Sequence, residues 1–354
     1  MLIYVIGTAL AMLFAKYAMN AKTYPALKNS YRILAFLSFV PLTVIAALRY
    51  NVGTDYDYVY TPFFYSINSG GEKFNEVGFN IINQITYLIS EKPFLMFAVV
   101  AVLTLLFMFL AFYEQSVNVC VSIYIFVVGL FYFNSLNQIR QALAMAIAVY
   151  AMKYLWKREP IKYFLLILLA ISMHTSAVIY IPIYFIYGIR ANVKAHIIFI
   201  LCAIVAQPVL KGAIQFVISK TKYAWYLDSI FGQQGFSIIT FAFILVTLLL
   251  LYYCQLAGKD TEDKQFDLML NMFLFGVCFM LYSAIIPQAD RLTNSMTIIT
   301  PFIVPKALLR IKEKNRRLVM FFIFSFFFIL KLLHDIYWQG WYDVIPYETF
   351  FSQI

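Results

Sequence analysis

The chain has 354 residues, of which 63% are hydrophobic and 12% charged, and its formal net charge is +10. Soluble globular domains are about 25% charged and about 45–50% apolar, so this composition excludes an ordinary soluble enzyme. The basic residues lie in short loops between apolar blocks, which indicates orientation in a membrane rather than a nucleic-acid partner. We therefore expect an all-α polytopic membrane protein.

The apolar residues fall into blocks of about 20, the length that a helix needs to cross a bilayer. The blocks span residues 2–19, 31–48, 93–113, 117–134, 139–156, 195–211, 236–256, 267–286, 290–309 and 318–336. Together with a broken stretch at 161–189 they predict a single membrane domain over residues 1–354, with about 11–12 membrane-inserted helices. The four cysteines have no C-x-x-C spacing, and the sequence predicts neither a metal site nor a cofactor.

Residues 49–92 form a predicted outer loop after the second block. It opens with "RYNVGTDYDYVY", which contains Arg49, Asp55 and Tyr56. Gly53 permits a tight turn that would bring Asp55 back toward Arg49. The alternative is an interfacial anchor, since arginine and tyrosine are common at lipid headgroups.

An amphipathic helix on the outer surface is predicted within residues 72–92, where apolar residues recur at helical spacing. Glu76 precedes this helix and is either a functional carboxylate or a solvated loop residue. Arg140 and Gln141 begin the span "NQIRQALAMAIAVYAMKYL" at its outer end. A cation at a helix N-terminus faces the positive end of the helix dipole, so Arg140 needs an anionic partner from the protein or from a ligand.

The stretch 161–189 is too long for one ordinary span and too short for two, and "SMHTSA" interrupts it at His174. A short broken helical hairpin here places the basic loops "KREPIK" and "RIKEKNRR" on the same, cytoplasmic side, and both chain termini outside. His174 would then lie at the floor of an outward-facing cavity. The alternative for His174 is a buried histidine with a purely structural role.

Two further outer segments follow. Residues 211–235 are a predicted outer loop, and "PQADRLTNS" places Asp290 and Arg291 at the outer start of a span. A local ion pair between these two residues is the alternative to a function. The C-terminal "HDIYWQGWYDVIPYETFF" is interpreted as an aromatic belt with a short amphipathic tail.

Three arginines on the outer side indicate an anionic ligand, because the guanidinium fork matches phosphate and stays charged. We assign Arg140 and Arg291 to a diphosphate, with Arg49 close by. Gln141, Tyr56 and Asp290 are candidate sugar contacts. A base for an acceptor hydroxyl would be His174, Glu76 or Asp55, with no order among them. A phosphate and sugar site at membrane depth suggests a polyprenyl-diphosphate glycan.

The motifs "RYNVGTDYDYVY", "EVGFNIINQI", "IRQALAMAI", "MHTSAVIYIPIY", "ADRLTNSMTIITPF" and "IPYETFF" follow one another from about residue 45 to the C-terminus. In this order they resemble the EpsG-type branch of bacterial Wzy polysaccharide polymerases. The resemblance implies a GT-C-like, metal-independent glycosyltransferase that polymerises undecaprenyl-diphosphate-linked oligosaccharide repeat units into O-antigen, capsule or exopolysaccharide.

The resemblance also implies a multi-pass protein of the bacterial inner membrane with an outward-facing active site. Its expected partners are the lipid-linked donor and acceptor, membrane lipids and a chain-length regulator protein, and no nucleic acid. Two alternatives stay open. A lipid-linked oligosaccharide transporter or flippase would use the same arginines without a base, and an O-antigen ligase would use the same donor with another acceptor.

Overall fold

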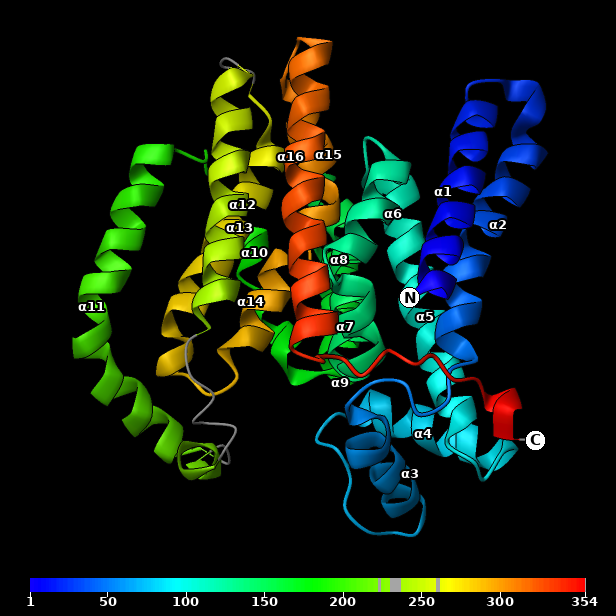
Figure 1. The fold of residues 1–354 in the computed structure, drawn as a ribbon. Coiled ribbons are helices and arrows are strands. Elements are labelled where there is room, and N and C mark those ends of the chain that lie inside the picture. Colours follow the sequence, from blue (N-terminus) through cyan, green and yellow to red (C-terminus); the bar gives the residue numbers. More distant parts are fainter. Residues whose placement is uncertain (222–223, 230–236, 259–261, 354) are drawn as a thin grey trace. The chain divides into compact units, whose positions relative to one another are not determined.

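The computed structural model describes residues 1–221, 224–229, 237–258 and 262–353 (Figure 1). Helices make up most of this part of the chain, and its extended backbone pairs at an isolated antiparallel bridge between Arg49 and Thr349. The chain forms two compact units. The first comprises Met1–Ile181, Val304–Lys306 and Ser325–Ile354, and the second comprises Pro182–Ile303 and Ala307–Phe324.

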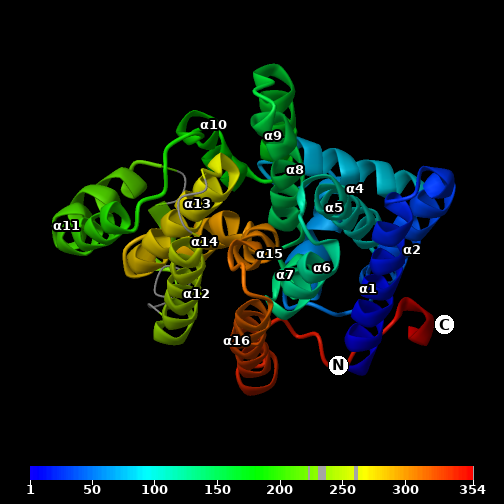
Figure 2. The ribbon, with the colours of Figure 1, turned by 90° about the horizontal axis from the view of Figure 1, so that it is seen from above.

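The first unit contains nine α-helices and the end of a tenth. They are α1 (Leu2–Lys22), α2 (Lys28–Ala47), α3 (Thr61–Asn68), α4 (Val77–Ile89), α5 (Phe94–Gln115), α6 (Val119–Val128), α7 (Phe131–Asn137), α8 (Ile139–Trp156), α9 (Pro160–Met173) and the last part of α16 (Lys314–Leu333). Helix α1 packs along α2 and α6, and α5 packs on α2 and α8 (Figure 2).

Helix α8 forms the centre of the first unit. It is buried along almost its whole length and packs against α5 and α9. Its core positions include five small residues, Ala142, Ala144, Ala146, Ala148 and Ala151. Small side chains allow neighbouring helices to approach closely. The packing therefore fixes the first turn of α8, where Arg140 lies.

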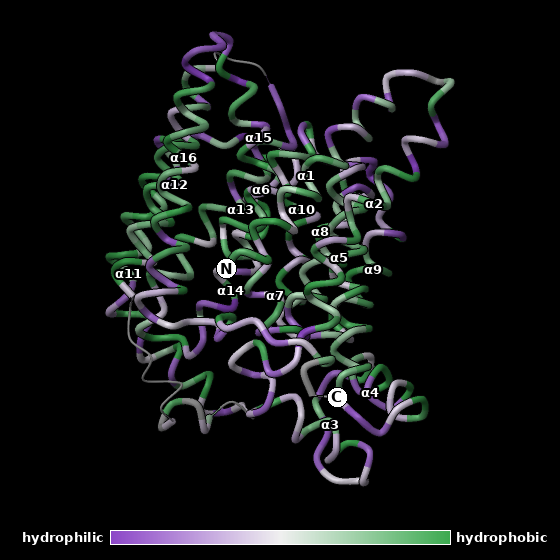
Figure 3. The backbone as a smooth tube through the Cα atoms, turned by 45° about the vertical axis from the view of Figure 1, so that its right-hand side comes forward, coloured by the Kyte–Doolittle hydropathy of each residue, from purple (hydrophilic) through white to green (hydrophobic). Residues whose placement is uncertain are grey.

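The second unit contains α10 (Ile183–Ile186), α11 (Val193–Ser219), α12 (Ile238–Ala257), α13 (Lys264–Leu281), α14 (Ala289–Thr297), most of α15 (Thr300–Arg310) and the start of α16. Helix α13 packs on α12 and α14. Polar side chains tie α11 to α13, and the imidazole of His196 contacts Asn271 at 2.8 Å. The tube in Figure 3 shows hydrophobic colour along the long helices and hydrophilic colour in many of the connections.

Within the described residues, seven helices are long and apolar enough to span a membrane, or nine if each of two bent pairs counts as one span. The bent pairs are α6 with α7 and α14 with α15. This result confirms an all-α polytopic membrane protein. The expected 11–12 membrane-inserted helices also included α8 and two shorter apolar helices, Pro160–Met173 and Thr175–Ile186, which are outside that set of spans.

The predicted break at His174 is confirmed. Helix α9 ends at Met173, His174 is extended, and a 3-10 turn begins at Thr175. The predicted outer loop at 49–92 contains α3 and the predicted amphipathic helix, which is α4. The segment expected as an outer loop at 211–235 starts inside α11, which continues to Ser219. Residues 222–223 and 230–235 of that segment lie outside the described part of the chain.

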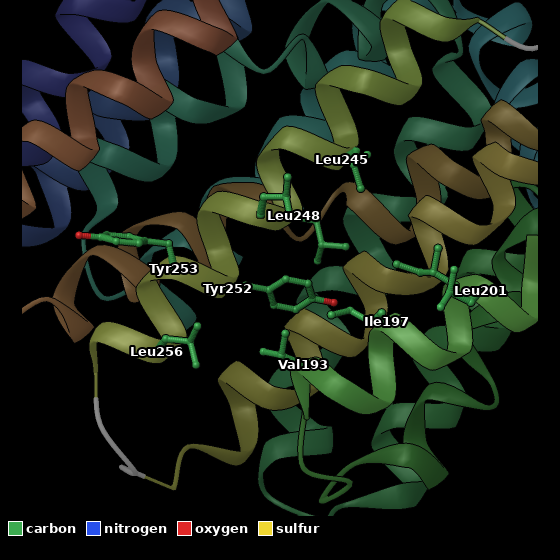
Figure 4. A pocket seen from close by; sticks show the side chains of 10 residues that line it. Val193, Ile197, Leu201, Leu245, Leu248, Tyr252, Tyr253 and Leu256 are labelled. Carbon is green, nitrogen blue, oxygen red and sulfur yellow. The ribbon is translucent and has the colours of Figure 1, made fainter.

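An apolar cavity of about 440 Å³ lies in the second unit between α11 and α12. Its lining includes Val193, Ile197, Leu248 and Tyr252 (Figure 4). None of the site residues predicted from the sequence is among its ten lining residues. The cavity therefore does not identify the polar site, which has to be located from the side-chain contacts themselves.

Candidate functional site

Arg49 follows the C-terminal end of α2 and is almost completely buried, with 1% of its surface exposed. Its three guanidinium nitrogens have no hydrogen-bond partner among the described residues. Burial lowers the pKa of Arg49, but a guanidinium starts so high that it stays protonated. A buried cation without a counter-ion is costly. The position therefore favours binding of an anion.

Aromatic side chains surround this guanidinium. Its central carbon lies 5.5 Å from the ring centre of Phe97, and the ring of Tyr56 stacks on Phe97 at 3.8 Å. The hydroxyls of Tyr4 and Tyr132 donate to backbone carbonyls at 3.1 and 2.8 Å. Burial raises the pKa of Tyr56 more than the charge of Arg49 lowers it, so this phenol is neutral. Tyr56 thus adds no negative charge to balance Arg49.

Residues 339–350, which we call the C-terminal strap, run alongside the segment that carries Arg49. The amide of Tyr50 donates to the carbonyl of Glu348, and the amide of Phe350 donates to the carbonyl of Leu48, both at 3.0 Å. These bonds flank the bridge between Arg49 and Thr349. No local sequence pattern predicts this pairing, and the aromatic belt with a short amphipathic tail that is expected here does not include it.

Gly53 makes the turn that follows Arg49. Its φ is +111°, and a Cβ there would lie 2.5 Å from the carbonyl oxygen of Leu136. Its amide donates to the carbonyl of Asp343 in the strap at 3.0 Å. The amide of Asp55 donates to Oδ1 of Asn137 at 2.9 Å. The turn therefore forms as expected, but it does not bring the Asp55 carboxylate to the guanidinium of Arg49, which has no partner among the described residues.

Arg140, Glu76 and Thr175 form a second polar cluster in the first unit. Nη1 of Arg140 donates to Oε2 of Glu76 at 2.7 Å. Oε1 of the same carboxylate accepts from the hydroxyl and the amide of Thr175, at 2.8 and 3.2 Å. Burial alone would raise the pKa of Glu76, but the charge of Arg140 and the bonds from Thr175 hold it below its usual value. The protein itself supplies the anionic partner that Arg140 needs.

Close packing of α4 on α9 brings this cluster together. A Cβ at Gly78, in the first turn of α4, would lie 2.4 Å from Oγ of Ser172 near the end of α9. The glycine leaves room for this approach, which places Glu76 beside Thr175. The guanidinium carbon of Arg140 lies 3.8 Å from the ring centre of Phe74, so this ring packs against the guanidinium. Three distant sequence motifs therefore meet, although the outer side on which they were expected stays a prediction.

His174 caps the 3-10 turn that starts at Thr175. Its Nδ1 accepts from the amide of Ser176 at 3.2 Å and lies 2.7 Å from the hydroxyl of the same residue. An amide N–H can only donate, so Nδ1 carries the lone pair and the neutral ring carries its proton on Nε2. This tautomer is inferred from the hydrogen bonds. In this arrangement His174 offers Nε2 as a donor.

The remaining predicted residues have different surroundings. Tyr56 and Gln141 are buried in the first unit, the latter inside α8. Asp290 and Arg291 lie in the first turn of α14, in the second unit. The described residues contain no group of three His, Cys, Asp or Glu side chains that could hold a metal ion.

One polar network was missed in the sequence. Near the end of α16, Nζ of Lys331 forms an ion pair with Oδ2 of Asp335, and Nδ1 of His334 contacts Oδ1 of Asp335 at 2.9 Å. The signal was present as "KLLHD" at the end of a span, where ionisable residues are a functional indication. The neighbouring aromatic residues dominated the interpretation of that segment.

Comparison with known proteins adds a family assignment. The sequence model of the EpsG family matches residues 32–349. Searches of curated proteins and of solved structures gave no match. The matched range covers most of the chain and includes Arg49, the Glu76–Arg140 pair, His174 and Arg291. The chain therefore belongs to the EpsG family, the family of Wzy-type polysaccharide polymerases.

Proposed function

We propose that the protein is a metal-independent glycosyltransferase of the bacterial inner membrane. It polymerises undecaprenyl-diphosphate-linked oligosaccharide repeat units on the outer face, for O-antigen, capsule or exopolysaccharide. Membership of the EpsG family supports a polysaccharide polymerase in general. The observation that carries the proposal for the substrate is Arg49, whose buried guanidinium has no partner among the described residues. A diphosphate supplies the charge that this position lacks.

The reaction explains why a cation is needed there. A hydroxyl of the acceptor sugar attacks the anomeric carbon of the donor, and the bond from that carbon to the diphosphate oxygen breaks. The electron pair of this bond leaves on the diphosphate. Cations already in place stabilise the negative charge as it develops, without reorganisation.

The three arginines have different roles in this proposal. Arg140 is neutralised by Glu76 at 2.7 Å, whereas the buried guanidinium of Arg49 has no hydrogen-bond partner among the described residues. Arg140 adds hydrogen-bond donors while Glu76 holds its orientation. The assignment of Arg291 to the diphosphate, and of Asp290, Gln141 and Tyr56 to contacts with sugars, stays a prediction from the sequence.

Glu76 is a weak base in this arrangement, because its pKa lies below the usual value. His174 already uses Nδ1 as an acceptor for the turn that it caps. Asp55, in the loop after Gly53, keeps its place among the candidate bases. The donor and acceptor are the partners of the reaction, with membrane lipids around the protein and a chain-length regulator as a further partner.

Access to Arg49 requires movement of the C-terminal strap. The strap pairs with the segment on both sides of Arg49, and Tyr347 in the strap is bound through its hydroxyl to the carbonyl of Ile45 at 2.9 Å. A diphosphate with a lipid tail and a glycan cannot reach a side chain that is 1% exposed. We infer that the described conformation is closed, and that the substrate binds after the strap is displaced.

A reconstituted reaction tests the proposal. The purified protein in liposomes receives one synthetic undecaprenyl-diphosphate repeat unit, with a chelator and no other protein. We expect a ladder of longer lipid-linked glycans and release of undecaprenyl diphosphate. Arg49→Ala should lower the rate by about 10²–10³, the effect of removing one donor to a developing anion. Arg32→Ala, at the exposed other end of α2, is the matched control.

Two results would overturn the proposal. The first is no ladder from the cognate unit while that unit crosses the liposome membrane, which would identify a transporter. The second is an equal rate of polymerisation for Arg49→Ala and wild type at equal protein levels. Transfer of the glycan to an added lipid A core, without any ladder, would instead identify a ligase.

A further inference from the structure

His334 and Asp335 form a dyad at the end of the last span, in the first unit. Asp335 is 1% exposed, and its two carboxylate oxygens contact Lys331 and His334. His334 is 25% exposed, so one side of its ring reaches the surface. A carboxylate that orients a histidine in this way is the arrangement found in nucleophilic and general base catalysis.

The contacts of the dyad define which ring nitrogen can accept a proton. Asp335 forms an ion pair with Lys331, and the carboxylate of an ion pair can only accept hydrogen bonds. Nδ1 of His334 therefore carries the proton at its 2.9 Å contact with Oδ1, and Nε2 carries the lone pair. The side-chain amide of Gln339 lies 3.4 Å from Nε2, a long contact that an incoming hydroxyl can replace.

The backbone at the dyad is unusual as well. Residues His334–Trp338 form a π-helical turn after α16, and a second π-helical turn occurs at Tyr56–Tyr60, in the loop after Arg49. Such turns are rare in proteins, and those that do occur are often found at functional sites. The carbonyl of Asp335 accepts from the amide of Trp341 at 2.8 Å, which fixes the start of the C-terminal strap to the dyad.

The strap links the dyad to Arg49. Two residues after Trp341, the carbonyl of Asp343 accepts from Gly53, and Thr349 forms the bridge to Arg49. The dyad and the unpaired guanidinium therefore lie at the two ends of the same segment. Displacement of this segment, which substrate binding requires, therefore acts on both the dyad and Arg49.

We propose that His334 is the general base of the transfer and that Asp335 is its positioning residue. Nε2 of His334 takes the proton of the acceptor hydroxyl as the oxygen forms its bond to the anomeric carbon. The bond from that carbon to the diphosphate oxygen breaks, and its electron pair leaves on the diphosphate. Asp335 stabilises the resulting imidazolium, and the proton then passes to water at the outer surface.

His174 provides a matched comparison. Its Nδ1 accepts from Ser176, so its neutral ring has the proton on Nε2 and the lone pair inside the cap. His334 has the opposite tautomer, with the lone pair on the nitrogen beside the exposed side chain of Gln339. Two histidines of one unit therefore differ in which nitrogen can act as a base. His334 combines an orienting carboxylate on Nδ1 with an acceptor nitrogen at Nε2.

Chemical rescue tests this inference, which rests on the proposed function. His334→Ala should slow the liposome polymerisation by about 10²–10⁴, the usual contribution of a general base. Added imidazole should raise the polymerisation rate of His334→Ala at least tenfold, since it supplies the missing base. His334→Gln should lose the same activity and resist rescue, because its amide fills the site. His174→Ala should not respond to imidazole.

Binding of undecaprenyl diphosphate to each variant separates a lost base from a lost fold. We expect His334→Ala and His334→Gln to bind it as wild type does. A His334→Ala protein that polymerises within threefold of wild type overturns the inference, as does one that binds normally and gains nothing from imidazole. In both results the wild-type ladder leaves the proposed function standing, whereas a wild-type protein that forms no ladder overturns the proposed function itself.

Discussion

The guanidinium of Arg140 contacts the carboxylate of Glu76 at 2.7 Å, and the same carboxylate accepts two hydrogen bonds from Thr175. This pair joins the first turn of α8 to the start of α4 and the break after α9. The Glu76–Arg140 pair therefore contributes both to the stability of the fold and to the arrangement of the candidate site. Its consequences differ from those of Arg49, where the positive charge has no partner among the described residues.

Removal of Glu76 should destabilise the fold. Glu76→Gln leaves Arg140 without a counter-charge, and breaking a buried pair on one side costs about 3–5 kcal/mol. We expect the lower end of this range for the free energy of unfolding, because Arg140 is partly exposed. Thermal unfolding in detergent measures it. Glu72→Gln, at an exposed carboxylate of the same loop, is the control and should change little.

The same pair should produce a dependence of stability on pH. The pKa of folded Glu76 lies below its ordinary value of 4.5, so its contribution is complete above that value and is lost as the pH falls through the folded pKa. Wild-type stability should fall more steeply than that of Glu76→Gln below about pH 4.5. Parallel curves for the two proteins between pH 3 and pH 7 would contradict this role.

Arg49 should be a site where function and stability oppose each other. Replacing a buried charge by an apolar side chain of similar volume can stabilise a protein by about 1–4 kcal/mol. Arg49→Met should therefore raise the melting temperature of the ligand-free protein and abolish polymerisation. A decrease in stability together with loss of activity would show that Arg49 is a structural residue with a counter-ion.

A disulfide across the strap should block the reaction reversibly. Tyr50 lies opposite Glu348 beside the Arg49–Thr349 bridge, and such pairs have Cα separations of about 5.5 Å, within disulfide range. In a cysteine-free background, Tyr50→Cys with Glu348→Cys should lose at least about tenfold in rate on oxidation, because the strap cannot move, and recover with reductant. The rate of each single cysteine variant should not change when the oxidant is added. Full activity of the oxidised pair would show that strap displacement is unnecessary.

Gly53 should tolerate no side chain. Gly53→Ala adds a Cβ 2.5 Å from the carbonyl of Leu136 at a φ of +111°, so we expect a loss of more than about 1–3 kcal/mol, the usual cost of such backbone strain alone. Gly70→Ala is the matched control, since its φ is +82° and nothing lies within 4 Å of its Cβ. Equal unfolding free energies for the two variants would show that the contact with Leu136 is unimportant.

Hydropathy predicted the membrane class and most helices, because a span needs a long apolar run whatever its neighbours are. The break at His174 was also visible, since polar residues interrupt an apolar stretch. The block at residues 139–156 is the buried centre of the first unit. Its many alanines are the sequence feature that indicates such close packing. The expectation that Glu76, Arg140 and His174 share one side of the membrane predicts that they lie near one another, and the side itself stays a prediction.

The pairing of these groups could not be predicted. Whether an arginine has a counter-ion depends on side chains that are distant in sequence, as with Arg140 and Glu76. The bridge between Arg49 and Thr349 joins residues 300 positions apart, and no local pattern encodes such a contact. The base function of a histidine likewise depends on which nitrogen its neighbours occupy, as His174 and His334 show.

The most direct test of the central claim is the affinity of the purified protein for undecaprenyl diphosphate. It should be measured for wild type, Arg49→Lys, Arg49→Met and the control Arg32→Ala. Removing one partner of a buried charge pair costs about 2 kcal/mol or more, so Arg49→Met should bind at least about 30-fold more weakly. Arg49→Lys should be intermediate, because it keeps the charge and loses the planar fork. Equal affinity of Arg49→Met and wild type would contradict the assignment of Arg49 to the diphosphate.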